Sequence, residues 1–141
     1  MESMTDNNLD KLQESLSLKF YKTGFLHQAL IHSSYLNENP KEFKTSNDRL
    51  ELLGDSILGA VVTSELYRLH PEWQEGKLTE ARAEIVSGDA LSKVGKRLNL
   101  GMYLTIGKGE ESNGGRTRPS NLAATFEALV GALFLDQGFE A

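Results

Sequence analysis

The chain has 141 residues, 39% of them hydrophobic and 25% charged, and this composition predicts one globular domain with a substantial core. Its net charge of −5 at pH 7 argues against a protein that coats nucleic acid, and the absence of cysteine excludes disulfides and thiolate metal sites. No apolar run approaches the ~20 residues of a membrane span and residues 1–6 lack a signal-peptide pattern, so we expect a cytoplasmic protein without membrane segments.

Helical periodicity dominates the first third of the chain. We expect residues 1–8 to form a flexible N-terminus, although a short amphipathic helix is already indicated over residues 7–18. A second helix is predicted over residues 24–33 and carries His27 and His32. A spacing of five places these two rings on different faces of a helix, whereas a helical metal pair needs a spacing of four. Both are therefore interpreted as structural histidines.

The middle of the chain is predicted to contain its longest helix. A polar loop over residues 37–46 leads into a helix over 49–69, which lacks proline and is apolar nearly all round. Such a helix is usually buried in a core. Two further helices are predicted over residues 78–87 and 89–98, the second of them amphipathic. Residues 101–106 show the only strand-like alternation, and it is short.

The last third combines a glycine-rich loop with a very apolar helix. Residues 107–119 hold four glycines and predict a mobile, partly basic loop. This loop lacks the Gly-Lys-Ser/Thr ending of a phosphate-cradling loop, which argues against a nucleoside triphosphate site. A helix over 121–136 follows, apolar on nearly every side, with Glu127 as its one interior charge. The whole pattern predicts an all-α domain.

Three acids share one side of the predicted central helix. Asp48, Glu51 and Asp55 are spaced by three and four residues. An unpaired carboxylate in apolar surroundings is costly or becomes neutral, so a cation is expected opposite them. One reading is an ordinary buried ion pair with Arg49, Arg82 or a lysine. The other reading is a divalent metal ion.

The residue types favour a hard cation if a metal is bound. Glu51, Asp55 and Glu127 supply oxygen ligands of the kind that Mg²⁺ or Mn²⁺ selects, and no cysteine or histidine pair suits zinc. Such sites activate water and neutralise charge on phosphorus. Spacing alone does not place Glu127 beside the other two acids. It indicates only that a cation between the two helices would stabilise the unpaired acids of both. Metal-dependent phosphoester hydrolysis is therefore one hypothesis.

Several segments resemble the ribonuclease III family. Residues 47–56 read Asn-Asp-Arg-Leu-Glu-Leu-Leu-Gly-Asp-Ser and closely resemble that family's signature, Asn-Glu-Arg-Leu-Glu-Phe-Leu-Gly-Asp. Further segments similar to the family, in the same order and spacing, are residues 29–35, 75–79 with 82–83, 107–110 with 114–115, and 126–129. The resemblance covers about residues 10–140 and is very specific.

The resemblance implies a homodimeric, all-helical endonuclease domain over residues 1–141. It implies cleavage of double-stranded RNA with Mg²⁺, for which Mn²⁺ may substitute, leaving 5′-phosphate and 3′-hydroxyl ends and processing precursors such as ribosomal RNA. The metal ligands would be Glu51, Asp55 and Glu127, of which Asp55 and Glu127 are catalytic. Asp48 and Glu110 would position substrate or water. We expect the basic residues that bind RNA phosphates to be Lys77, Arg82, Lys108, Arg116 and Arg118.

Three departures from the family pattern leave alternatives open. Leu52 stands where the family usually has a phenylalanine that plugs into the partner subunit, so the dimer contact is expected to be less filled. Ala124 stands where the family places a fourth acid. The chain ends at Ala141, whereas most bacterial members continue into a double-stranded-RNA-binding domain, so we expect an isolated catalytic domain. The alternatives are a catalytically weak or inactive RNA-binding module of the same fold and an unrelated helical protein with buried ion pairs.

Overall fold

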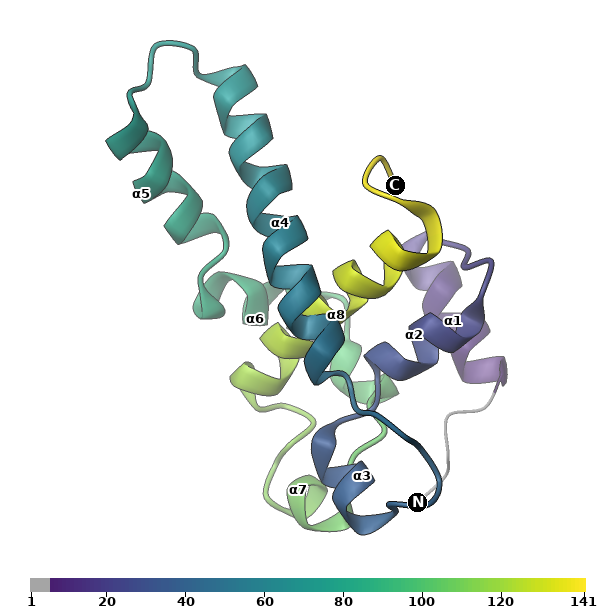
Figure 1. Cartoon of the computed structure of the whole chain (residues 1–141). Coiled ribbons are helices and arrows are strands. Elements are labelled where there is room, and N and C mark those ends of the chain that lie inside the picture. Colours follow the sequence, from purple (N-terminus) through teal and green to yellow (C-terminus); the bar gives the residue numbers. More distant parts are fainter. Residues whose placement is uncertain (1–5) are drawn as a thin grey trace.

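The computed structural model describes residues 6–141, whose regular elements are all helices (Figure 1). Within this range the elements are α1 (Asp6–Leu16), α2 (Thr23–Ala29), α3 (Ser33–Glu38), α4 (Asp48–Leu69), α5 (Glu75–Ile85), α6 (Gly88–Arg97), the 3₁₀ helix η1 (Leu100–Tyr103), α7 (Lys108–Ser112) and α8 (Pro119–Gln137). The predicted all-α class is confirmed. Of the expected flexible N-terminus, residues 1–5 lie outside the described residues, and residues 6–8 belong instead to α1.

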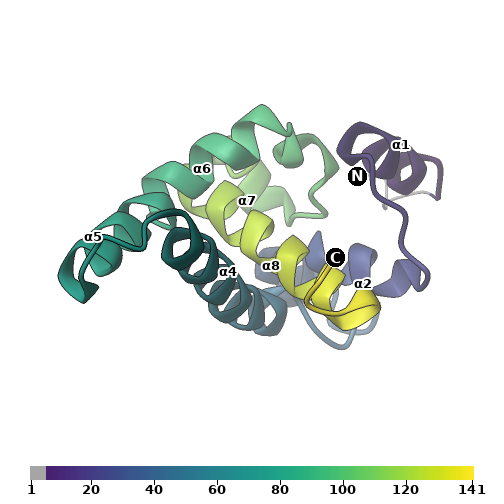
Figure 2. The ribbon, with the colours of Figure 1, turned by 90° about the horizontal axis from the view of Figure 1, so that it is seen from above.

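Helix α8 forms the centre of the fold. It packs against α2, α4 and α6, and Figure 2 shows it lying between α4 and α6. Because neighbours surround it, its apolar residues can be buried on several sides, and Ala128 and Ala132 are fully buried. The core around it also includes Leu12, Leu26, Leu30 and Leu100. In the part of the chain that the structure describes, no helix is long and apolar enough to cross a membrane.

Two glycines allow α4 and α8 to cross in direct backbone contact. A Cβ atom added to Gly54 on α4 would collide with the carbonyl oxygen of Glu127 on α8. A Cβ atom added to Gly131 on α8 would collide with the carbonyl oxygen of Leu50 on α4. Only glycine permits so close an approach. The crossing therefore brings the turn that contains Asp55 next to the turn that contains Glu127.

The prediction that the central helix is buried all round is wrong. Of the 22 residues of α4, only Leu50, Gly54 and Leu66 are buried, while Leu52 and Tyr67 are 72% and 73% exposed. Figure 1 shows the second half of α4 extending away from α8 with α5 alongside it. Periodicity reports that a face is apolar, but it does not report whether a neighbour covers that face.

Some predicted boundaries also differ from the structure. The helix predicted over residues 24–33 ends earlier, because α2 stops at Ala29 with Leu30 as its C-cap, and α3 begins separately with His32 as its N-cap. Its Nδ1 atom accepts a hydrogen bond from the backbone N–H of Ser34 at 3.1 Å. The strand-like residues 101–106 form η1 and one isolated bridge. The loop predicted over residues 107–119 contains the short helix α7.

Candidate active site

Carboxyl groups from α4 and α8 meet at the helix crossing. Asp55 of α4 forms a hydrogen bond with Glu127 of α8. Burial of Glu127, that hydrogen bond and the charges of Asp55 and Glu51 raise the pKa of Glu127 to about 7. At neutral pH the pair can therefore hold a proton. The structure brings together two acids that are 72 positions apart in the sequence.

Glu51 joins this group through its charge. Burial raises the pKa of Glu51, and the charges of Asp48 and Asp55 raise it further. Glu51 in turn contributes to the raised pKa of Glu127. Asp48 itself is exposed at the start of α4. The four acids therefore act on one another electrostatically, and we refer to Glu51, Asp55 and Glu127 as the carboxylate cluster.

No basic side chain of residues 6–141 forms an ion pair with the carboxylate cluster. The reading in which Arg49, Arg82 or a lysine neutralises these acids in an ordinary ion pair is therefore wrong for the described residues. As they lie, no three Asp, Glu or His side chains within the same range form a ready-made metal-binding group. The cluster nevertheless offers only carboxylate oxygens and repels itself, and this donor chemistry fits a hard divalent cation.

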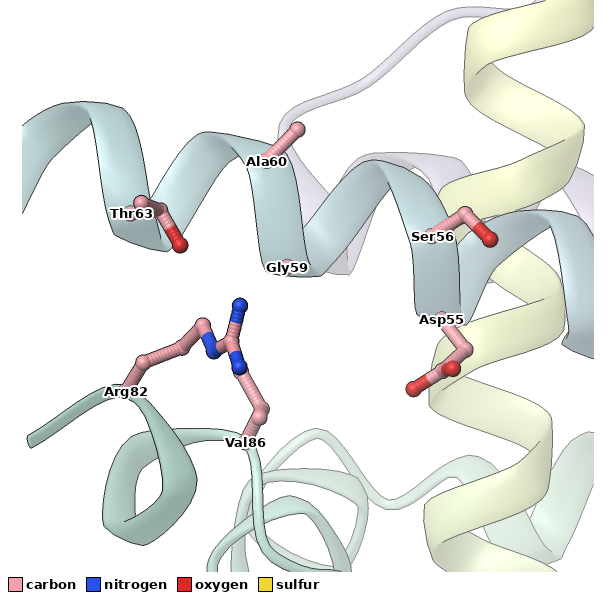
Figure 3. A pocket seen from close by; sticks show the side chains of 7 residues that line it. All are labelled: Asp55, Ser56, Gly59, Ala60, Thr63, Arg82 and Val86. Carbon is pink, nitrogen blue, oxygen red and sulfur yellow. The ribbon is translucent and has the colours of Figure 1, made fainter. Parts of the chain in front are cut away.

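A pocket of about 570 Å³ lies beside Asp55, between α4 and α5. Figure 3 shows the Asp55 carboxylate on one side of it and Arg82 reaching from α5 toward α4. Arg82 forms no ion pair within the described residues, and the buried hydroxyl of Thr63 has no hydrogen-bond partner there. The complete lining consists of Asp55, Ser56, Gly59, Ala60, Thr63, Arg82 and Val86. Asp55 and an unpaired guanidinium face one pocket, and a cation held by that carboxylate would, together with the guanidinium, suit a phosphate group.

Three other predicted site residues hold the α7 segment to the rest of the domain. Glu110 pairs with Arg118 at 3.1 Å and accepts a hydrogen bond from Asn121 at 3.0 Å. Arg116 pairs with Glu111 at 2.7 Å and donates hydrogen bonds to two backbone carbonyls. None of these side chains lines the pocket beside Asp55. Their predicted roles toward RNA stay predictions, and the structure gives each of them a structural role.

The remaining predicted residues are also outside that pocket. Lys77 lies over the ring of Trp73, with 4.5 Å from Nζ to the ring centroid. The other ring contact of Trp73 is His70, stacked at 3.7 Å, at the turn between α4 and α5. Lys108 is exposed at the start of α7. Leu52 projects from α4 into solvent, as a contact residue of a second subunit would.

Two polar residues fix the starts of α4 and α8: Asn47, which the sequence analysis did not single out, and His32, whose predicted structural role is confirmed. Asn47 is buried, and its side chain donates to the carbonyl of Ala29 at 3.0 Å while its backbone N–H donates to Ile31 at 2.8 Å. His32 shares a hydrogen bond of 3.1 Å between Nε2 and Asn121 on α8. One short segment, residues 29–32, thus holds both helices of the carboxylate cluster. An asparagine just before a helix predicts a side-chain cap, but Asn47 makes no such hydrogen bond, so its bond to the distant Ala29 had no signal in the sequence.

Comparison with families and curated proteins gives a uniform result. The family model described as Ribonuclease-III-like matches residues 22–141. A protein named Ribonuclease 3 from Dehalococcoides mccartyi is 45% identical over 134 residues, which are 95% of this chain and 56% of that protein. One of the same name from Borreliella burgdorferi is 47% identical over 133 residues, or 94% and 54%. The chain therefore spans about half the length of the curated relatives it matches.

Solved structures agree with this result. The crystal structure of the nuclease domain of ribonuclease III from Campylobacter jejuni is 37% identical and superposes with a TM-score of 0.85, covering 94% of this chain and 86% of that one. A second structure of the same nuclease domain has a TM-score of 0.87 and is described as flexible in a region involved in dimer formation.

Proposed function

The chain belongs to the ribonuclease III family, and on that basis we propose that it is an endoribonuclease that cleaves double-stranded RNA with Mg²⁺. The observation that carries the proposal is the carboxylate cluster at the α4–α8 crossing, which no cation of residues 6–141 neutralises. The proposed reaction is hydrolysis of a phosphodiester. The oxygen of water bonds to phosphorus while the bond to the 3′ oxygen breaks, which leaves 5′-phosphate and 3′-hydroxyl ends.

Glu51, Asp55 and Glu127 would hold the Mg²⁺, and Mn²⁺ would serve as a substitute. The chemistry that such a cation supplies is activation of water and neutralisation of the charge that builds on the phosphate. Without the cation the pair of Asp55 and Glu127 can hold a proton at neutral pH, because burial, the hydrogen bond with Asp55 and the neighbouring charges raise the pKa of Glu127 to about 7. Binding of the cation would displace that proton. Asp48, exposed at the open end of the cluster, would position RNA or water.

The pocket beside Asp55 would receive the RNA backbone. Arg82 has an unpaired guanidinium that faces this pocket (Figure 3), and a guanidinium binds phosphate oxygens through paired hydrogen bonds. Double-stranded RNA is recognised mainly through shape, 2′-hydroxyls and phosphates. The proposed substrates are accordingly structured precursors such as ribosomal RNA in the cytoplasm, selected by helical form.

The protein would act as a homodimer. Four large apolar side chains of α4 are exposed, namely Leu52, Val61, Tyr67 and Leu69, and burial of Leu52 against a second subunit would remove one of the most exposed of them from water. A two-fold dimer would present one carboxylate cluster to each strand of a duplex. Leu52 lies on the same turn as Glu51, so the proposed dimer contact would lie next to the carboxylate cluster.

The deciding experiment incubates the 141-residue chain with long double-stranded RNA in Mg²⁺, in Mn²⁺ and in EDTA. We expect cleavage that EDTA abolishes, and labelling of the products should reveal 5′-phosphate ends. A folded protein that binds the RNA but cuts it at no metal concentration would contradict the proposal. That result would favour the non-cleaving RNA-binding module, for which Ala124 is the main argument.

A further inference from the structure

A second concave surface lies on the side of α8 that faces away from α4. It measures about 670 Å³ and is formed by the C-terminal half of α6, by η1 and by the start of α8. Figure 2 shows α6 and α4 on opposite sides of α8. We call this surface the α6–η1 groove. It shares no lining residue with the pocket beside Asp55.

The floor of the α6–η1 groove is mostly apolar. Leu122 and Pro119 form part of it, and Met102 is 58% exposed at its edge. The backbone at Gly101 approaches so closely that an added Cβ atom would collide with the carbonyl oxygen of Arg116. Methionine is flexible and polarisable, so it adapts to different apolar side chains. The volume and this lining are typical of a site that receives an apolar group.

The rim of the groove is positively charged, in a chain whose net charge is −5. Lys96 forms no ion pair within residues 6–141. Lys93 pairs only with Asp89 at 3.0 Å, and both side chains are largely exposed, so that pair is weak. Asn99 and Thr117 add polar groups to the lining. An apolar floor with lysines above it complements a ligand that carries an apolar group beside a carboxylate.

The lining argues against single-stranded nucleic acid as the occupant. Single-stranded nucleic acids are held by aromatic side chains on which bases stack, and no aromatic residue lines the groove. Arg116, the one arginine in the lining, is turned to Glu111 and to two backbone carbonyls. The cationic groups that remain available are therefore the amines of Lys93 and Lys96.

We propose that the α6–η1 groove binds an acidic peptide segment of a partner protein. The segment would place a large apolar side chain on the floor next to Met102 and a carboxylate beside Lys96. Lys93 would add a second favourable charge, since complementary charges at a rim speed association and select the partner. The proposal concerns a face of the domain that the carboxylate cluster does not use.

The test is selection of short random peptides displayed on phage against the 141-residue chain. Enriched peptides are then synthesised with a fluorescent label, and their affinity is measured by anisotropy for the wild type, Lys96→Glu and Met102→Asp. We expect enriched sequences to join an Asp or Glu to a large apolar residue, and each substitution to weaken binding by about tenfold or more, equivalent to ~1.4 kcal/mol. Lys44→Glu, which reverses an exposed lysine outside the groove, is the control and should bind like the wild type.

Three results would overturn the proposal. The first is that the selection fails to enrich acidic peptides with a large apolar residue. The second is that both groove variants bind the enriched peptides as the wild type does. The third is that the same two variants lose binding of double-stranded RNA in EDTA, which would assign the groove to RNA. Both substituted side chains are exposed, and melting curves verify that the variants fold. If Met102→Asp unfolds, Lys93→Glu combined with Lys96→Glu replaces it. RNA cleavage by Lys96→Glu is expected to match the wild type, so the outcome is independent of the nuclease assignment.

Discussion

Asp55 on α4 and Glu127 on α8 share a hydrogen bond across the point where the two helices cross. Two carboxyl groups can do this only if one of them is protonated, because two carboxylates would repel each other. The backbone contact at Gly54 holds the helices in this arrangement. The fold therefore maintains a pair of acids whose mutual repulsion a divalent cation would relieve.

The first prediction concerns Glu127→Gln. The amide keeps the size of the side chain and can still hydrogen-bond Asp55, but it cannot supply a carboxylate to a cation. We expect cleavage of double-stranded RNA to be lost while the melting temperature of the metal-free protein is unchanged or higher, since repulsion within the cluster falls. A time course of cleavage and a melting curve on the same sample measure both. Normal cleavage by this variant would remove Glu127 from the proposed site.

The second prediction concerns the pH dependence of stability. The pKa of Glu127 rises from its ordinary value near 4.5 to about 7 on folding, so the folded state binds this proton more tightly than the unfolded state. The contribution of Glu127 to stability is therefore fully present below about pH 4.5 and is lost as pH rises toward 7. We expect wild type to lose stability relative to Glu127→Gln across that interval. Urea denaturation of both proteins at several pH values measures it, and parallel curves would contradict the assignment.

The third prediction concerns Gly54→Ala. An added methyl group would collide with the carbonyl oxygen of Glu127 and push α4 away from α8. Overpacking of this kind typically costs about 1–3 kcal/mol, and separation of Asp55 from Glu127 should also reduce cleavage. Gly59→Ala is the matched control for stability, because it lies on the same helix with no atom near its added Cβ; it is not compared in cleavage, since Gly59 lines the pocket beside Asp55. The control should gain up to ~1 kcal/mol from helix propensity, so equal losses of stability in both variants would disprove the role of the crossing.

The fold class and the acids of the site could be predicted from sequence, but their surroundings could not. Apolar periodicity correctly indicated α6 and α8 as helices, yet it also suggested a buried α4, whose second half extends beyond α8. The separate start of α3 involves the ring of His32, which bonds to Ser34 and to the distant Asn121. The orientation of Arg116 likewise depends on its hydrogen bonds to the backbone carbonyls of Gly101 and Leu104, which lie near it only in the folded chain. Long-range partners of polar side chains leave no periodic trace in a sequence.

The fourth prediction concerns Leu52→Asp and the proposed homodimer. Leu52 is 72% exposed on α4, so a charge there should leave the subunit folded but oppose burial against a second apolar face. We expect light scattering to show a dimer for the wild type and a monomer for the variant, with loss of double-strand cleavage. Tyr21→Asp, at an 81% exposed position outside α4, is the control and should remain dimeric. A wild type that is monomeric and still cuts both strands would contradict the dimer.

The last prediction concerns Ala124, which lies half-buried on α8, three residues before Glu127. Residues three apart on a helix share a face, so an acid at this position could support the carboxylate cluster. Loss of one supporting group around a metal typically lowers affinity or activity by about 10–100-fold without removing the site. We therefore expect an active enzyme that needs more Mg²⁺ than Ala124→Asp, and that Mn²⁺ assists. Cleavage measured across a Mg²⁺ titration should shift to lower concentration, or reach a higher plateau, in the variant. Identical curves would place position 124 outside the reach of the cation, whereas no cleavage by either protein would favour the RNA-binding module.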